Sequence, residues 1–201
     1  MLSARARYLF DLNGYIVVRA VLTPAEVASA NAAIDQRQAS LCERGEGTLR
    51  NTKAGSALAG SGSNGRLDLG GLLEWRDTAV FRDLLAHPRL LPYLHDFLGP
   101  GFRLDHRPLL IAQNAGSEGF ALHGGPLTAS GEFNQHLQYT VRGDRIFTTL
   151  LAASVSLVDT VPGDGGFCVL PGSHKSNFAT PADLAQVFPD YATLGGHPTV
   201  L

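Results

Sequence analysis

The stretch Gly165-Gly166-Phe167-Cys168-Val169-Leu170-Pro171-Gly172-Ser173-His174-Lys175 decides the fold of this chain. Its centre, 167–170, is a short apolar run that follows a Gly-rich turn and ends at Pro171-Gly172. Short apolar runs bounded by Gly and Pro are typical of β-strands. The polar turn that follows contains His174, and its simplest interpretation is a loop held by side-chain hydrogen bonds.

Further strand candidates lie on the N-terminal side of this stretch. Residues 108–112 and 120–122 are short apolar runs between Gly-rich turns. The longest candidate, 147–159, is apolar nearly throughout, as expected of a strand that is buried on both faces. The second half of the chain is therefore predicted to be a set of antiparallel strands.

The first hundred residues have a mainly helical pattern. Residues 15–18 are a short β-branched run and predict one strand. Thr23 is a suitable N-cap, followed by Pro and by Glu at the third position, so a helix is expected from there to about Gln38. Two more helices are predicted at about 77–86 and 88–98. Helices followed by antiparallel strands indicate an α+β protein, with helices covering a β-sandwich or jelly roll.

Composition excludes several classes of protein. The chain has 201 residues, 44% of them hydrophobic, which is too apolar for a disordered protein. A net charge of −2 argues against a nucleic-acid partner, and no apolar run is long enough for a membrane span. The N-terminus lacks the apolar core of a signal peptide. Cys42 and Cys168 form neither a disulfide framework nor a zinc motif, so a reducing cytoplasm is expected.

Seven histidines are the main candidates for chemistry. His123 follows an apolar run and precedes Gly124-Gly125-Pro126. A histidine at a strand end beside a glycine turn can point into the mouth of a barrel, so His123 is either a metal ligand or a structural histidine. His87 and His95 fall on the helical segments and are expected at the surface or in caps. His136 lies in a polar stretch without a recognisable partner.

Two segments resemble a known family. The stretch 165–175 is similar to the G-G-x-x-x-x-P-G-S-H-K segment of phytanoyl-CoA dioxygenase-like proteins, and residues 10–18 with 22–26 resemble the opening of that family. The resemblance covers roughly residues 8–180 in the right order.

This resemblance implies a double-stranded β-helix, the cupin-like jelly roll, with N-terminal helices packed outside. It also implies a mononuclear non-haem Fe(II) dioxygenase that uses 2-oxoglutarate and O2 to hydroxylate a small organic molecule. Such a site holds iron with two His and one carboxylate on one face. His123 falls where the first iron-binding His of the family would be. His174 is expected to be structural or to lie at the pocket edge.

The sequence departs from the family pattern at the metal site. The family usually has His-x-Asp, whereas this chain has His123-Gly124-Gly125. Glu132 or Asp144 could supply the carboxylate from the following loop. Alternatively, the glycine resembles iron-dependent halogenases, in which loss of the carboxylate opens a position for chloride. The spacing leaves both alternatives open.

A second departure concerns the C-terminal part of the family pattern. The family's distal His and the Arg that binds the 2-oxoglutarate carboxylate follow the Pro-Gly-Ser-His segment. No Arg follows Arg145, and His197 is the only His after the Pro-Gly-Ser-His segment. Because the sequence stops at Leu201, before the last jelly-roll strands, a fragment or a truncated gene product is expected.

The domain prediction is a single domain over 1–201, with a helical part at about 1–100 and a partial jelly roll at about 101–201. The Gly-rich stretch 45–71 is predicted to be a long loop, either a lid or a surface insertion. A third functional alternative is a catalytically inactive jelly-roll module that binds a ligand or a partner.

Overall fold

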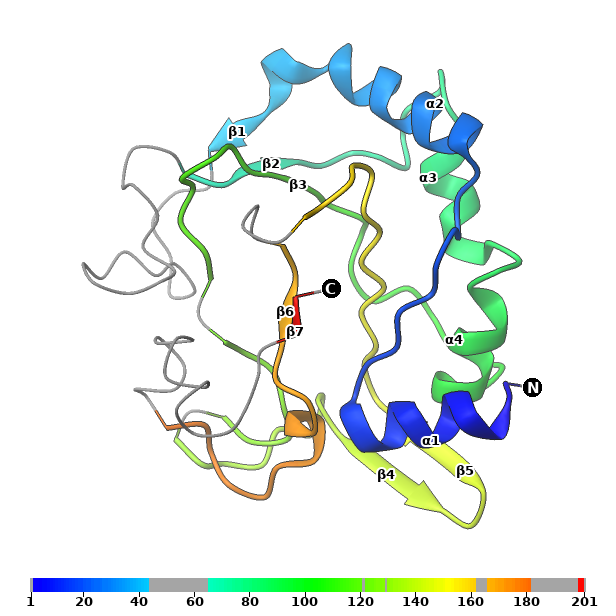
Figure 1. The fold of residues 1–201 in the computed structure, drawn as a ribbon, viewed down its shortest axis with the longest axis vertical. Helices are drawn as coiled ribbons and strands as arrows, with labels where there is room; N and C mark the ends of the chain where they lie inside the picture. The colour runs from blue at the N-terminus through cyan, green and yellow to red at the C-terminus, as the bar shows by residue number, and fades with distance from the viewer. Residues whose placement is uncertain are drawn as a thin grey trace.

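In the computed structural model, the helices lie along the outer edge of the molecule. The strands lie beside the helices or between them (Figure 1). The structure describes residues 2–43, 65–120, 122–128, 130–161, 166–181 and 199–200. Its helices are α1 (Ala4–Asn13), α2 (Pro24–Asp35), α3 (Val80–Asp83) and α4 (Leu91–Leu98), with short 3-10 turns η1 (Gln38–Ser40), η2 (Leu84–Ala86) and η3 (Ser173–Lys175).

The described strands form three separate antiparallel sheets. The first has the order β1 (Cys42–Glu43), β2 (Leu67–Leu69), β3 (Leu110–Ala112); the second is the hairpin β4 (Tyr139–Arg142) and β5 (Arg145–Thr148); the third pairs β6 (Cys168–Val169) with β7 (Thr199–Val200). In the third sheet Cys168 pairs with Val200, so residues near the end of the sequence lie beside the strand that precedes the Pro-Gly-Ser-His turn. Helices combined with antiparallel sheets confirm the α+β prediction at this level.

The predicted cap begins α2. The Thr23 hydroxyl accepts a hydrogen bond from the Glu26 amide at 3.3 Å, and the Thr23 amide donates to the Glu26 carboxylate at 2.7 Å. This reciprocal pair is a capping box, and the helix ends at Asp35, a turn earlier than predicted. Ala30 and Ala33 form its buried face.

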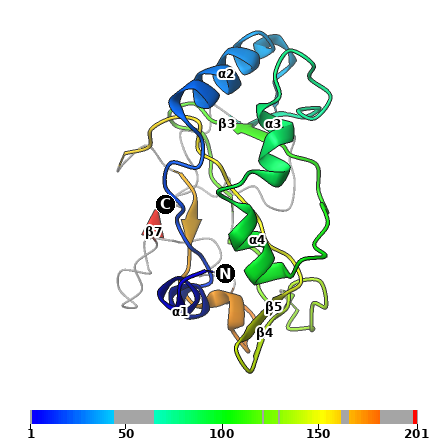
Figure 2. The same cartoon turned by 90° about the vertical axis from the view of Figure 1, so that its right-hand side faces the viewer.

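Two apolar clusters hold the helices. The larger one joins α2, β2 and α3 and consists of Leu22, Ala30, Ala33, Leu69, Leu72, Trp75, Val80 and Phe81. In the smaller one, the rings of Phe10 and Phe97 stack at 3.7 Å and connect α1 to α4. Figure 2 shows α3 and α4 following one another along the same side of the molecule. This smaller cluster fixes the end of α1, which in turn contacts the candidate site.

Two strand predictions are wrong. Residues 15–18 are assigned to no strand and connect α1 to the cap of α2. In 147–159, only the first two residues belong to a strand, β5, and Phe147 and Val158 are 46% and 72% exposed. The segment was predicted to be buried on both faces, but a strand needs hydrogen-bonded neighbours, and beyond Thr148 no described strand pairs with it.

Other predictions are confirmed with shifted limits. The strands predicted at 108–112 and 167–170 are present as β3 and β6. Residues 45–64 of the predicted long loop lie outside the described residues, and its last part contains the strand β2. The helical half therefore contributes two strands, β1 and β2, that the pattern did not predict. In the part of the chain that the structure describes, no helix has the length and apolar character needed to span a membrane.

Candidate functional site

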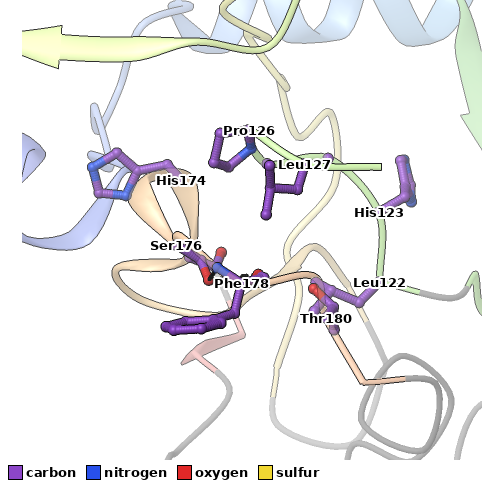
Figure 3. Close-up of a pocket in the computed structure, with 11 residues that line it drawn as sticks. Leu122, His123, Pro126, Leu127, His174, Ser176, Phe178 and Thr180 are labelled. Atoms are coloured by element: carbon purple, nitrogen blue, oxygen red, sulfur yellow. Dashed lines mark hydrogen bonds between the residues drawn. The ribbon is translucent and has the colours of Figure 1, made fainter. Parts of the chain in front are cut away.

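A pocket of about 130 Å³ lies between two segments that are far apart in the sequence. One wall is the segment 122–127, which contains His123 and the two glycines after it. The other wall is the segment that contains η3 and the residues after it. Figure 3 shows the pocket, which is lined by Leu122, His123, Gly124, Gly125, Pro126, Leu127, Ser173, His174, Ser176, Phe178 and Thr180. The predicted metal ligand and the Pro-Gly-Ser-His turn thus meet in one place.

His123 is an exposed residue on the rim of this pocket. The backbone that follows it has φ values of +99° at Gly124 and +92° at Gly125, a region that L side chains rarely adopt. The carbonyl of Pro126 accepts a hydrogen bond from the Asn134 amide at 2.9 Å, which anchors the end of the wall. The glycines therefore make the sharp turn that brings His123 to the pocket.

Gly125 packs against the opposite wall. A Cβ atom placed on Gly125 would lie 3.5 Å from the Ser173 carbonyl oxygen, which is ordinary van der Waals contact. Space therefore permits a small side chain at this position, but the backbone conformation disfavours it. The aspartate expected here by family resemblance would need a different backbone path.

The turn with Ser173 and His174 is held by the C-terminal end of α1. The Gly172 amide donates to the Asn13 carbonyl at 2.9 Å, and the Lys175 ammonium donates to the Asp11 carbonyl at 2.5 Å. Gly14 has φ +80° and ends α1 in the left-handed conformation that is common at helix C-termini. A Cβ on Gly14 would lie 2.3 Å from Nδ1 of His174, so only glycine permits this close approach.

His174 lies between Gly14 and the ring of Tyr139, whose centroid is 4.5 Å from that of the imidazole in an edge-on contact. Its two ring nitrogens are buried and have no hydrogen-bond partner of acceptable geometry. Burial, and then the neighbouring Lys175 ammonium, lower the pKa of His174, while the Asp11 carbonyl and carboxylate act in the opposite direction. In Figure 3 the ring is turned away from Pro126 and Leu127. His174 lines the pocket, as expected of a residue at the pocket edge.

Asp11, on α1, connects this helix to β4 and to η3. The Tyr139 hydroxyl donates to its Oδ1 at 2.7 Å, and the Lys175 ammonium lies 3.8 Å from its Oδ2. Burial, and then this bond to a carboxylate, raise the pKa of Tyr139. Asp11, Gly14, Tyr139, His174 and Lys175 are called the α1 clasp below. Sequence analysis missed Asp11 and Tyr139, because no local motif relates residues that are 128 positions apart.

Neither of the two alternative carboxylates is among the described residues that line the pocket. Glu132 is an exposed residue of a tight turn, where its backbone bonds to Thr128. Asp144 lies in the turn between β4 and β5, where its carbonyl accepts a hydrogen bond from Arg7. Asp144 lines a separate pocket with Arg7 and Asp96, so the expectation that it could reach the metal is not met.

The described residues do not by themselves form a metal centre. Three donor groups on one face are required for a two-His, one-carboxylate site. Within the described ranges, no group of three or more His, Cys, Asp or Glu side chains is placed to hold an ion. Among the described residues, two imidazoles, those of His123 and His174, line the pocket. His197 lies outside the described residues.

The two histidines predicted to fall on helical segments, His87 and His95, lie at the C-terminal end of η2 and on α4. His87 was expected at the surface or in a cap; it is a cap, but it is buried. Its Nδ1 accepts a hydrogen bond from the Arg89 amide at 3.2 Å. His95 is exposed on α4, as predicted.

The fold is similar to two solved structures. The crystal structure of HygX from Streptomyces hygroscopicus with nickel, 2-oxoglutarate and hygromycin B bound matches 90% of this chain with a TM-score of 0.62 and 21% identity. HygX with nickel and 2-oxoglutarate bound matches 90% with a TM-score of 0.61 and 22% identity. The chain spans 66% and 64% of the length of those chains. No curated protein matches the sequence.

Helices beside antiparallel sheets, with a histidine at the rim of a pocket, are consistent with the class of α+β proteins that have a cupin-like fold. The sequence model described as phytanoyl-CoA dioxygenase (PhyH) matches residues 10–192. The chain belongs to this family, as the segments 10–18 and 165–175 predicted.

Proposed function

We propose that the protein is a non-haem Fe(II)- and 2-oxoglutarate-dependent dioxygenase that hydroxylates a small organic molecule, with O2 as co-substrate. The observation that carries the proposal is the family match over 10–192 together with the position of His123 at the pocket rim, opposite the Pro-Gly-Ser-His turn. In this proposal the sheets belong to a jelly roll, residues 1–201 form one domain, and His123 is a metal ligand. The proposed setting is the cytoplasm, which the two free cysteines support.

The proposal assigns to the described residues only part of the metal site. His123 supplies one nitrogen, and the described residues that line the pocket include no carboxylate, arginine or lysine. The bound molecules of HygX, nickel, 2-oxoglutarate and hygromycin B, support the choice of co-substrate and of a small organic substrate.

Metal titration tests the proposal directly. We expect the 201-residue chain to bind Ni²⁺ or Co²⁺ in calorimetry with 2-oxoglutarate present, and His123→Ala to weaken binding by at least about tenfold, because even outer residues of metal sites contribute that much. His136→Ala is the matched control, since His136 is also exposed but lies outside the pocket lining. Equal affinity in His123→Ala and wild type would exclude His123 as a ligand. Absence of binding by the wild type would contradict the proposal for this chain.

Gly125 favours a second candidate, an iron-dependent halogenase on the same scaffold. It lines the pocket two residues after His123, at the place of the expected carboxylate. If this candidate is correct, a product with the mass shift of chlorine forms only when chloride is present, and Gly125→Asp loses it. Gly124→Asp is the control, because Gly124 has a similar φ of +99° and open space around it. Mass spectrometry that detects no chloride-dependent product would remove the halogenase.

A further inference from the structure

We propose that His174 is a pH-sensitive positioning residue, which holds the pocket wall in place when neutral and releases it from α1 when protonated. The wall concerned is η3, which carries Ser173 and His174 into the pocket lining. The inference rests on the α1 clasp alone. It does not depend on metal binding or on the proposed oxygenase activity.

The neutral ring fits its surroundings, whereas the charged ring does not. An imidazolium carries two N–H donors, but neither buried ring nitrogen of His174 makes a hydrogen bond of acceptable geometry. The Asp11 carbonyl beside the ring already accepts a hydrogen bond from the Lys175 ammonium. The ring touches the Gly14 backbone on one side and the edge of Tyr139 on another, which leaves it little room to rotate. Protonation would therefore bury an unsatisfied cation, which is a costly state.

The charged groups of the clasp do not relieve this cost. From η3 itself, the Lys175 ammonium repels a second positive charge. From α1, the Asp11 carboxylate is the nearest anion, but it already accepts the Tyr139 hydroxyl from β4 at 2.7 Å and faces Lys175 at 3.8 Å. The Tyr139 hydroxyl stays neutral at physiological pH, because the ordinary tyrosine pKa of about 10 is raised further here. The closed clasp therefore binds a proton less well than an open one in which water reaches the imidazole.

The sign of the pH effect follows from linkage. Because the pKa of His174 is lowered in the closed clasp, the open form takes up the proton more readily. The closed form is fully favoured above the ordinary histidine pKa of about 6.5 and is lost as the pH falls from there toward the lowered pKa. The pocket responds because the Ser173 carbonyl faces Gly125 across it.

Hydrogen exchange measured by mass spectrometry on the metal-free 201-residue chain tests the inference. Between pH 7.5 and 5.5, after correction for intrinsic rates, we expect exchange to rise by up to about tenfold per pH unit in the segments 11–14, 122–127 and 171–176. Exchange in α2 should not follow this trend. His174→Phe, which keeps an aromatic ring but cannot titrate, should abolish the pH dependence in the three segments. His136→Phe, at an exposed position, should leave it unchanged.

Two results would overturn the inference: a wild-type chain whose three segments exchange at the same corrected rate throughout, or a His174→Phe variant that retains the full pH dependence. An NMR titration of the histidine rings in the wild type covers the case in which His174→Phe does not fold. We expect the His174 ring to titrate below the ordinary histidine pKa of about 6.5. Titration of His174 at or above that pH would also contradict the inference.

Discussion

Replacement of Gly14 by Ala is expected to lower the free energy of unfolding by about 2–5 kcal/mol. About 1–2 kcal/mol of this comes from the left-handed backbone, because Gly14 has φ +80°. A further 1–3 kcal/mol, roughly, comes from overpacking, since the new Cβ would lie 2.3 Å from Nδ1 of His174. Urea unfolding followed by circular dichroism measures the change.

Gly131→Ala separates the two contributions. Gly131 has φ +83° and nothing within 4 Å of its Cβ position, so this variant should lose only the backbone part. A double variant that adds His174→Ala to Gly14→Ala should recover part of the loss, because the clash partner is removed. Equal losses for Gly14→Ala and Gly131→Ala would mean that His174 does not press against Gly14.

Phe97→Ala should lower the free energy of unfolding by about 3–5 kcal/mol, which is a large part of the 5–15 kcal/mol typical of a whole protein. Phe97 is 1% exposed and stacks on Phe10, so its removal opens a cavity between α4 and α1. Phe10 also contacts Tyr139, at 6.2 Å between ring centroids, so the cavity would loosen the α1 clasp as well.

Phe133→Ala is the matched control for Phe97→Ala. Phe133 is 69% exposed, and its loss should change the free energy of unfolding by no more than about 0.5 kcal/mol. The same urea measurement serves both variants. A similar loss in Phe97→Ala and Phe133→Ala would contradict the packing between α1 and α4.

The elements that sequence analysis predicted well are those with local signals. Thr23 and Glu26 form a capping box within four residues, and the Gly and Pro around 167–170 mark a strand. The segment 147–159 was predicted wrongly because its apolar character describes a buried environment, whereas strand formation depends on partners elsewhere in the chain. His87 shows the same limit, since its burial depends on neighbours such as Glu26.

The candidate site was predicted in part. His123 was identified from the glycines after it, and the structure brings it to one pocket with the Pro-Gly-Ser-His turn. Whether His123 binds a metal stays a prediction. Asp11, Gly14 and Tyr139 could not be found in advance, because their importance comes from their contacts with each other and with the turn η3. That turn lies more than 30 positions from Tyr139 and more than 150 positions from Asp11 and Gly14 along the sequence.

The clasp has a consequence for the order of events during synthesis of the chain. Asp11 is bound by Lys175, which lies 164 positions later in the sequence. At about 5–20 residues per second, a ribosome needs roughly 8–33 s to add those residues after α1 has been made. During that time α1 has no completed turn to bind. A newly made α1 should therefore be a segment that molecular chaperones can bind until the last contacts of the clasp are available.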